Sequence, residues 1–261
     1  SAGAQRASSS VRPFKLGGPA ITALYKSWFD AWAKACVDNQ WRCDFFSWHR
    51  YSTDLDQYAK DMAEAESWLQ QYPALEPTLE LHITEWGFDS ENHAGYDSAY
   101  GAAHTVAAAI AMMNRVEMAF TFEIQDGKDP NGQANWGRWG LFTHNDFGAN
   151  AKARFRALKL LDSIPDQRLS IVGNGSWVKA LAARDNDGSI KLIMANFDPK
   201  GQHSETVPLT LQHVEAGNYQ LDVEYLSGRR MSNVLSVEND TLITQIVLGV
   251  NEVAKVTVRK I

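Results

Sequence analysis

The first 164 residues pass four times from a short run with strand-like alternation to a longer run with helical spacing. Apolar and polar residues alternate in the predicted strands, whereas apolar residues recur every three to four positions in the predicted helices. Strands that are joined through helices lie parallel in one sheet, so the pattern predicts an α/β fold. The predicted strands are 14–20, 44–51, 81–88 and 118–123, and the predicted helices are 21–39, 55–72, 98–114 and 150–164.

The pattern changes after Pro165, where short alternating runs continue without a further amphipathic helix. Asp187-Gly188 between two apolar runs is a hairpin signal, and several such strands predict a small antiparallel β-sandwich over 165–261. Residues 1–10 are small and polar and predict a disordered lead-in.

Four strand–helix units over 11–164 are half of what a closed TIM (β/α)8 barrel requires, since such a barrel typically has about 250 residues. The sequence therefore predicts a half-barrel followed by a sandwich. A parallel sheet needs cover on both faces. We expect a homo-oligomer or a complementing half-barrel chain to supply that cover.

The run Leu81–Phe88 places a carboxylate, Glu85, at the C-terminal end of the third strand. Strict alternation puts Leu81, Ile83 and Glu85 on one face and His82 on the other. Chemistry in strand–helix barrels occurs at the C-terminal ends of strands, which makes Glu85 a catalytic candidate. The alternative is a structural carboxylate that pairs with a nearby arginine.

Composition narrows the other function classes. The formal net charge is -6 and no Lys/Arg cluster occurs, so we expect no nucleic-acid partner. No apolar run is long enough to cross a membrane, and no signal peptide is recognisable, which leaves a secreted or periplasmic origin open. The seven histidines lack His-x-x-x-His spacing, and neither a Gly-x-Ser-x-Gly elbow nor a Gly-rich phosphate loop occurs. We therefore predict no metal and no cofactor.

The two cysteines, Cys36 and Cys43, lie close together in the sequence. Two thiols form neither a disulfide framework nor a complete zinc site. We interpret both as buried thiols, with a disulfide as the less favoured alternative.

Four strand ends together resemble strands five to eight of a family 39 glycoside hydrolase, from about Val11 to Ile164. The segments that carry the resemblance are Leu16–Ala20 (LGGPA), Asp44–Tyr51 (DFFSWHRY), Ile83–Gly87 (ITEWG) and Phe120–Phe122 (FTF). This clan A family includes β-xylosidases and α-iduronidases, and the predicted sandwich resembles its accessory domain.

The resemblance implies a retaining glycoside hydrolase that acts on β-xyloside-like or related glycans. Glu85 matches the nucleophile, and His49 and Tyr51 match residues that line the sugar site and orient it. Retaining chemistry needs a second carboxyl group about 5–5.5 Å away, which acts as acid and base. In the family this glutamate follows an asparagine on strand four. No Asn-Glu pair precedes Gly17, so we expect the acid/base half to be missing from this chain or supplied by another chain.

Further candidates lie around the last predicted strand. Trp86, Glu123 and Asp126 are predicted to bind substrate, although Glu123-Ile124 stands where the family usually has Ser-Asp. Glu123 as a catalytic partner of Glu85 is the less favoured interpretation. Trp136 and Trp139 would either shape the sugar pocket or pack the loop. The alternative function is a non-catalytic carbohydrate-binding or assembly module derived from a glycosidase.

Overall fold

The computed structural model describes residues 2–7, 10–113, 115–128, 131, 137–173 and 175–261. The chain divides into two compact units, Ser1–Ser90 with Ala111–Phe122 and Glu91–Ile110 with Glu123–Ile261. Each unit is described by itself below. No described helix has both the length and the apolar character needed to span a membrane.

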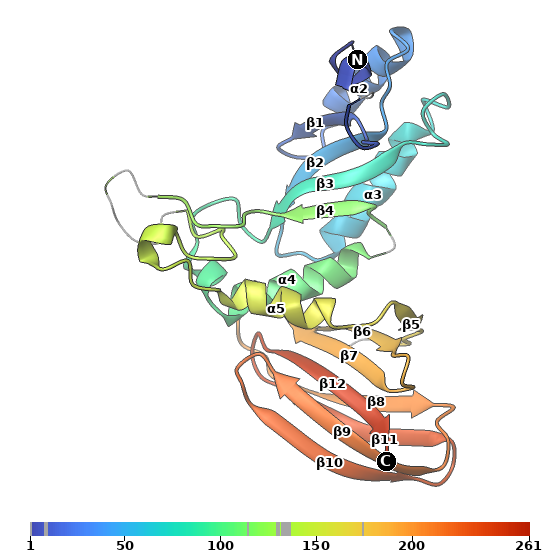
Figure 1. Ribbon diagram of the computed structural model, residues 1–261, viewed down its shortest axis with the longest axis vertical. Helices are drawn as coiled ribbons and strands as arrows, with labels where there is room; N and C mark the ends of the chain where they lie inside the picture. Colours follow the sequence, from blue (N-terminus) through green and yellow to red (C-terminus); the bar gives the residue numbers. More distant parts are fainter. Residues whose placement is uncertain (1, 8–9, 114, 129–130, 132–136, 174) are drawn as a thin grey trace. The chain divides into compact units, whose positions relative to one another are not determined.

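The first unit contains a four-stranded parallel sheet in the order β1-β2-β3-β4, which confirms the predicted parallel α/β arrangement (Figure 1). The strands are β1 (Gly17–Ile21), β2 (Phe45–Tyr51), β3 (Glu80–Gly87) and β4 (Met118–Thr121), and the helices are α1 (Ala2–Ala7), α2 (Lys26–Asp38) and α3 (Asp56–Leu69). Helix α1 lies where a disordered lead-in was predicted. Alanine, glutamine and arginine there favour helix intrinsically.

Helices α2 and α3 cover one face of this sheet. The ring of Phe29 in α2 meets that of Phe46 in β2 with centroids 4.8 Å apart, and Asp61 in α3 accepts a hydrogen bond from Trp48. On β4, by contrast, the side chains of Met118 and Phe120 are 49% and 51% exposed.

The second unit consists mainly of antiparallel strands. A six-stranded sheet has the order β10-β9-β12-β7-β6-β5, and β11 pairs with β8. The strands are β5 (Gln167–Leu169), β6 (Val178–Arg184), β7 (Ile190–Asn196), β8 (Glu205–Gln212), β9 (Gly217–Tyr225), β10 (Arg230–Val237), β11 (Thr241–Leu248) and β12 (Val253–Lys260). Both sheets contribute to one hydrophobic cluster, in which Leu242 and Ile246 of β11 join Val223 of β9 and Val256 of β12. Gly188, with φ of 83°, lies in the turn between the antiparallel strands β6 and β7, which confirms the predicted hairpin.

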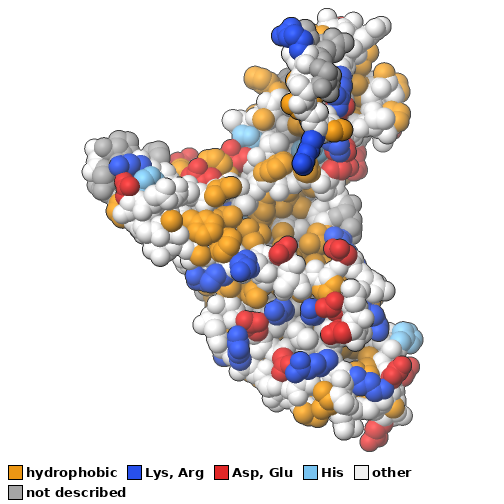
Figure 2. All heavy atoms as spheres, in the orientation of Figure 1, with side chains coloured by type: hydrophobic (Ala, Val, Ile, Leu, Met, Phe, Trp, Pro, Cys, Tyr) orange, Lys and Arg blue, Asp and Glu red, His pale blue; other side chains and the backbone are white. Residues whose placement is uncertain are grey.

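Helical segments also belong to the second unit. They are η1 (Ala94–Asp97), α4 (Ala99–Met112), η2 (Asn145–Phe147) and α5 (Ala153–Asp162). The part of α4 up to Ile110 belongs to the second unit, and its last two residues belong to the first. The division therefore differs from the predicted boundary at 164/165. One reason is that Tyr100 and His104 of α4 pack their rings against Phe197, with centroids 5.2 and 5.1 Å apart. On the surface shown in Figure 2, acidic and basic side chains are interspersed over the antiparallel strands.

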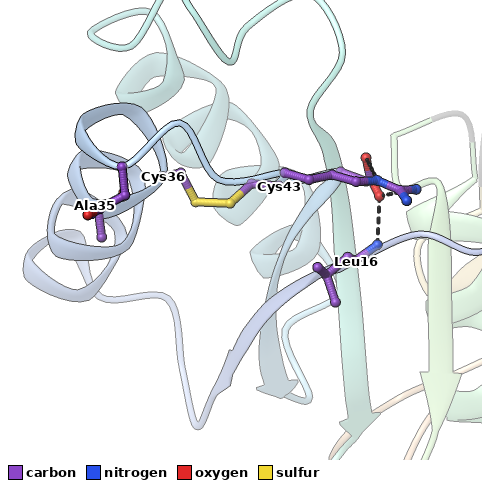
Figure 3. Close-up of a disulfide and its surroundings, with 7 residues drawn as sticks. Leu16, Ala35, Cys36 and Cys43 are labelled. Atoms are coloured by element: carbon purple, nitrogen blue, oxygen red, sulfur yellow. Dashed lines mark hydrogen bonds and ion pairs between the residues drawn. A yellow bond between two sulfur atoms is a disulfide. The ribbon is translucent and has the colours of Figure 1, made fainter. Parts of the chain in front are cut away.

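The two cysteines form a disulfide, so the prediction of buried thiols is wrong (Figure 3). The Cα atoms of Cys36 and Cys43 are 6.3 Å apart, within disulfide reach. After α2 the chain turns back through Gln40 (φ 51°), and the Trp41 N–H donates to the carbonyl of Cys36. This turn brings the cysteines together, and sequence spacing alone does not reveal it.

Candidate active site

Three predicted site residues meet at the C-terminal ends of two neighbouring strands in the first unit. Glu85 lies near the end of β3, and His49 and Tyr51 lie at the end of β2. In the parallel register, His49 stands beside Glu85 and Tyr51 beside Gly87. Parallel strands end at the same edge of a sheet, which is where α/β folds place reactive groups.

A β-bulge decides which way Glu85 points. Trp48 pairs with Ile83, but the next residue of β2, His49, pairs with Glu85, so Thr84 is an extra residue in β3. The register against β4 shifts at the same place, between Ile83 and Trp86. Such an insertion re-aims the side chain that follows it.

The predicted alternation is therefore wrong at Glu85. Residues in register in a parallel pair share a face, so Ile83 faces the helices with Trp48, and Glu85 shares the opposite face with His49. His82 also lies on that opposite face, stacked on Phe45 with ring centroids 4.3 Å apart. Without the extra residue, strict alternation would have pointed the Glu85 carboxylate toward the helices.

The two carboxylate oxygens of Glu85 have different neighbours. The Tyr51 hydroxyl donates to Oε1, and Nδ1 of His49 lies 3.4 Å from Oε2. About a fifth to a quarter of the His49 and Glu85 side chains is exposed to solvent. The carboxylate is thus oriented from two sides and remains accessible, as a nucleophile requires.

Trp86, which was predicted to bind substrate, is placed differently. It stands in register with Arg50, on the face that looks toward α3, and is only 3% exposed. An indole buried on that face cannot serve as an open platform for a sugar that reaches Glu85. The predicted role of Trp86 in binding substrate therefore does not fit this position.

Glu123 and Asp126 belong to the second unit. The backbone of Glu123 pairs with the loop, since its N–H donates to the carbonyl of Trp139 at 2.9 Å and its carbonyl accepts from Leu141 N–H at 2.8 Å. The Glu123 side chain is partly exposed. Trp136, the other tryptophan considered in this loop, lies outside the described residues.

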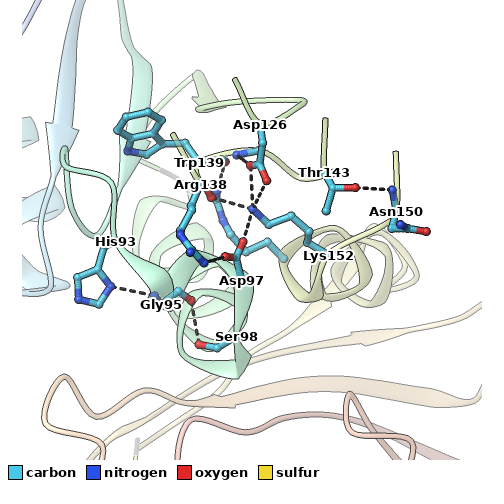
Figure 4. Close-up of polar contacts among 12 residues, drawn as sticks. His93, Gly95, Asp97, Ser98, Asp126, Arg138, Trp139, Thr143, Asn150 and Lys152 are labelled. Carbon is cyan, nitrogen blue, oxygen red and sulfur yellow. Dashed lines mark hydrogen bonds and ion pairs between the residues drawn. The ribbon is translucent and has the colours of Figure 1, made fainter. Parts of the chain in front are cut away.

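Asp126 is the centre of a buried polar network (Figure 4). Nζ of Lys152 lies 2.8 and 3.1 Å from the two Asp126 oxygens, and the N–H of Gly140 donates to Oδ1 at 2.8 Å. Lys152 also reaches Asp97 at 2.5 Å and the carbonyl of Arg138 at 2.8 Å. Burial raises the pKa of Asp126, and Lys152 acts in the opposite direction. Asp126 was predicted to bind substrate, but its carboxylate instead pairs with Lys152 and accepts a hydrogen bond from the loop backbone at Gly140.

Asp61 is the residue of this region that the sequence analysis missed. It lies in α3 and is 1% exposed, with its carboxylate hydrogen-bonded to Arg50 and Trp48. A signal was present in the sequence, because an acidic residue interrupts the apolar stripe of a helix where Tyr58, Met62 and Ala65 are buried.

Within the described ranges, no group of three or more His, Cys, Asp or Glu side chains is placed to hold a metal ion.

Solved structures show where this fold occurs. The GH39 enzyme from Xanthomonas axonopodis pv. citri superimposes with a TM-score of 0.75 at 17% identity, over 95% of this chain and 60% of that one. A monomeric β-xylosidase from Caulobacter crescentus CB15 gives 0.74 at 18% identity, over 95% and 62%. A glucosidase from Croceicoccus marinus gives 0.74 at 20% identity, over 98% and 62%. The chain thus spans about three fifths of the length of these structures and shares their fold.

Sequence comparison supplies the family. No curated protein matches the chain. Residues 4–146, more than half of the 261 residues, match the family described as glycosyl hydrolase catalytic core. That segment includes the whole parallel sheet and the site around Glu85. The chain therefore belongs to the glycosyl hydrolase catalytic core family.

Proposed function

We propose that this chain is the nucleophile-bearing part of a retaining, family 39-like glycoside hydrolase that acts on β-xyloside-like or related glycans. The observation that carries the proposal is the oriented, accessible Glu85 carboxylate with Tyr51 and His49 on its two oxygens. The family assignment gives the reaction class. The substrate class follows from likeness to enzymes described as a β-xylosidase and a glucosidase.

In this proposal Glu85 attacks the anomeric carbon, and the bond to the leaving oxygen breaks as the glycosyl ester of Glu85 forms. Water then hydrolyses the ester and regenerates the carboxylate. Tyr51 and His49 keep Glu85 aimed at that carbon and line the sugar site. A second carboxyl group must protonate the leaving oxygen in the first step and deprotonate water in the second.

We place that acid/base group on a complementing half-barrel. The sole Asn-Glu pair of the sequence, Asn251-Glu252, lies among the antiparallel strands of the second unit. There Oε2 of Glu252 lies 2.9 Å from Nη2 of Arg229. We propose Glu123 as a substrate ligand, since hydrogen bonds to Trp139 and Leu141 hold its backbone while its side chain is partly exposed. In this arrangement the two antiparallel sheets form an accessory β-sandwich.

The exposed apolar residues of β4 support such a complement. Met118 and Phe120 are each about half exposed, and fully burying a side chain of this size contributes about 1.5–3 kcal/mol. Covering the remaining half of both would therefore contribute about 1.5–3 kcal/mol in total. We propose that a second copy or a complementing half-barrel chain covers them. Light scattering at micromolar concentration should show an assembly, and a stable monomer would refute a second copy as the cover.

Covalent labelling tests the role of Glu85. A dinitrophenyl 2-deoxy-2-fluoro-β-xyloside has a leaving group that departs without a proton, so labelling does not require the acid/base carboxyl. Mass spectrometry should locate the sugar on Glu85, and Glu85→Gln should abolish the label. Glu66→Gln, at an exposed glutamate of α3, is the matched control and should still be labelled.

Each labelling result has a definite meaning. A label on Glu123 would overturn the assignment of the nucleophile. Xylo-oligosaccharide binding without any label would favour the non-catalytic carbohydrate-binding alternative.

A further inference from the structure

The buried carboxylate of Asp61 lies on the helix side of the sheet, opposite the face that carries the proposed active site, and both of its oxygens accept hydrogen bonds. Asp61 of α3 accepts from Nε and Nη2 of Arg50 at 2.5 and 2.8 Å, which is a bidentate fork. Nε1 of Trp48 donates to it at 3.0 Å and Nε2 of Gln57 at 2.7 Å. Both oxygens therefore have two donors each, and the carboxylate is held rigidly.

The ion pair with Asp61 holds β2 at Arg50, which lies between the two residues proposed to orient the nucleophile. Arg50 lies between His49 and Tyr51, and strand alternation sends its side chain to the face opposite theirs. As long as Asp61 holds Arg50 on the helix side, alternation keeps its two neighbours on the face that carries Glu85. A slip of one residue would turn both away from it.

The same helix also holds the end of β3. The hydroxyl of Tyr58, three residues before Asp61, donates to the carbonyl of Gly87 at 3.3 Å. The N–H of Ser52, which follows β2, donates to that carbonyl at 3.0 Å. Gly87 comes two residues after Glu85. Helix α3 thus contacts the ends of both strands that carry the site.

Stability alone does not account for an ion pair here. Replacing a buried pair by well-packed apolar side chains is often neutral or stabilising, because charges are costly to desolvate. A fork, unlike an apolar contact, fixes direction as well as distance. We propose that Asp61 is a positioning residue, which acts through Arg50 to hold Tyr51 and His49 on Glu85. This inference rests on the proposed function, since it assigns Asp61 a part in orienting the nucleophile.

The test reads the Tyr51–Glu85 contact directly and needs no activity. Tyrosine labelled with 13C at Cζ gives a signal that reports hydrogen bonding of the phenol, and Tyr51→Phe identifies which of the eight tyrosine signals is the relevant one. Glu85→Gln then shows how far the Tyr51 signal moves when its charged acceptor is lost. Asp61→Asn should move the signal in the same direction.

A matched control comes from the same region of the chain. Asp54 is an exposed aspartate that pairs with Lys60 at 2.9 Å, just before α3. Asp54→Asn should leave the Tyr51 signal in place. If Asp61→Asn fails to fold, Arg50→Lys preserves the charge but loses the fork, and it should move the signal likewise.

The outcomes separate this proposal from the proposed function. A Tyr51 signal that stays in place in folded Asp61→Asn and Arg50→Lys variants, even with lowered melting temperatures, would overturn the positioning role. Failure of Glu85 to be labelled by the fluoroxyloside would overturn the proposed function without touching this measurement. In a labelling-competent assembly, Asp61→Asn should slow labelling by about 10- to 100-fold, because small misplacements of reacting groups cost that much.

Discussion

Removing the Lys152 amine should destabilise the second unit strongly. The Lys152 side chain is 5% exposed, and it neutralises Asp126, which is fully buried. In Lys152→Met the side chain keeps a similar length, but Asp126 retains only the backbone N–H of Gly140 among the hydrogen-bond donors described here. Leaving one partner of a buried pair uncompensated costs about 3–5 kcal/mol. We expect the free energy of unfolding to fall by that amount at pH 7.

The loss should depend on pH with a definite sign. Burial raises the folded-state pKa of Asp126 above its unfolded value, and without Lys152 nothing comparable opposes that rise. Stability from such a group is fully present below the unfolded pKa of about 3.9 and is lost as the pH rises through the folded-state pKa. The variant should therefore approach the wild type near pH 4 and fall behind as the pH rises toward 7.

Urea unfolding followed by circular dichroism at several pH values measures this difference. Lys128→Met is the matched control, because Lys128 pairs with Asp146 at 2.7 Å in the same loop but is 64% exposed. It should leave the unfolding midpoint unchanged, since exposed pairs contribute little. Adding Asp126→Leu to Lys152→Met should recover most of the loss. A cost of less than about 1 kcal/mol for Lys152→Met, or an equal cost at pH 4 and 7, would refute the reasoning.

Three further predictions concern other parts of the chain. Replacing Cys36 and Cys43 by serine should lower the free energy of unfolding by about 2–3 kcal/mol, as chain-entropy estimates for so short a loop give, and a reducing agent should reproduce the loss only in the wild type. In Gly17→Ala the added Cβ would lie 2.1 Å from the carbonyl oxygen of Phe45, so β1 must separate from β2 and the melting temperature should fall by several degrees. Burial alone would raise the pKa of Asp198, but hydrogen bonds from backbone N–H groups and a histidine lower it to about 2. The wild type should therefore lose stability as the pH falls from about 4 toward 2, and acid titration of Asp198→Asn should show a flatter profile.

Local pattern was sufficient for the four parallel strands and for the four helices predicted between and after them. Alternation predicted a strand at 81–88 and helical spacing predicted a helix at 98–114, and the structure has β3 at Glu80–Gly87 and α4 at Ala99–Met112. These signals depend only on neighbours a few positions apart, because side-chain direction repeats every two residues in a strand and every 3.6 in a helix. The motif match to a family, likewise a local property, singled out Glu85, His49 and Tyr51.

Tertiary structure decided the directions and the partners. The extra residue Thr84 reversed the face expected for Glu85. A sequence pattern does not reveal such a bulge, because an extra residue exists only relative to the register of the neighbouring strands. Asp126 was predicted as a sugar ligand, but in the structure it forms a buried ion pair with Lys152, which lies 26 residues further along the chain. A sequence pattern records what each residue prefers locally. Which carboxylate stays open to a substrate is decided by contacts between distant segments, because those contacts determine whether its charge is already compensated.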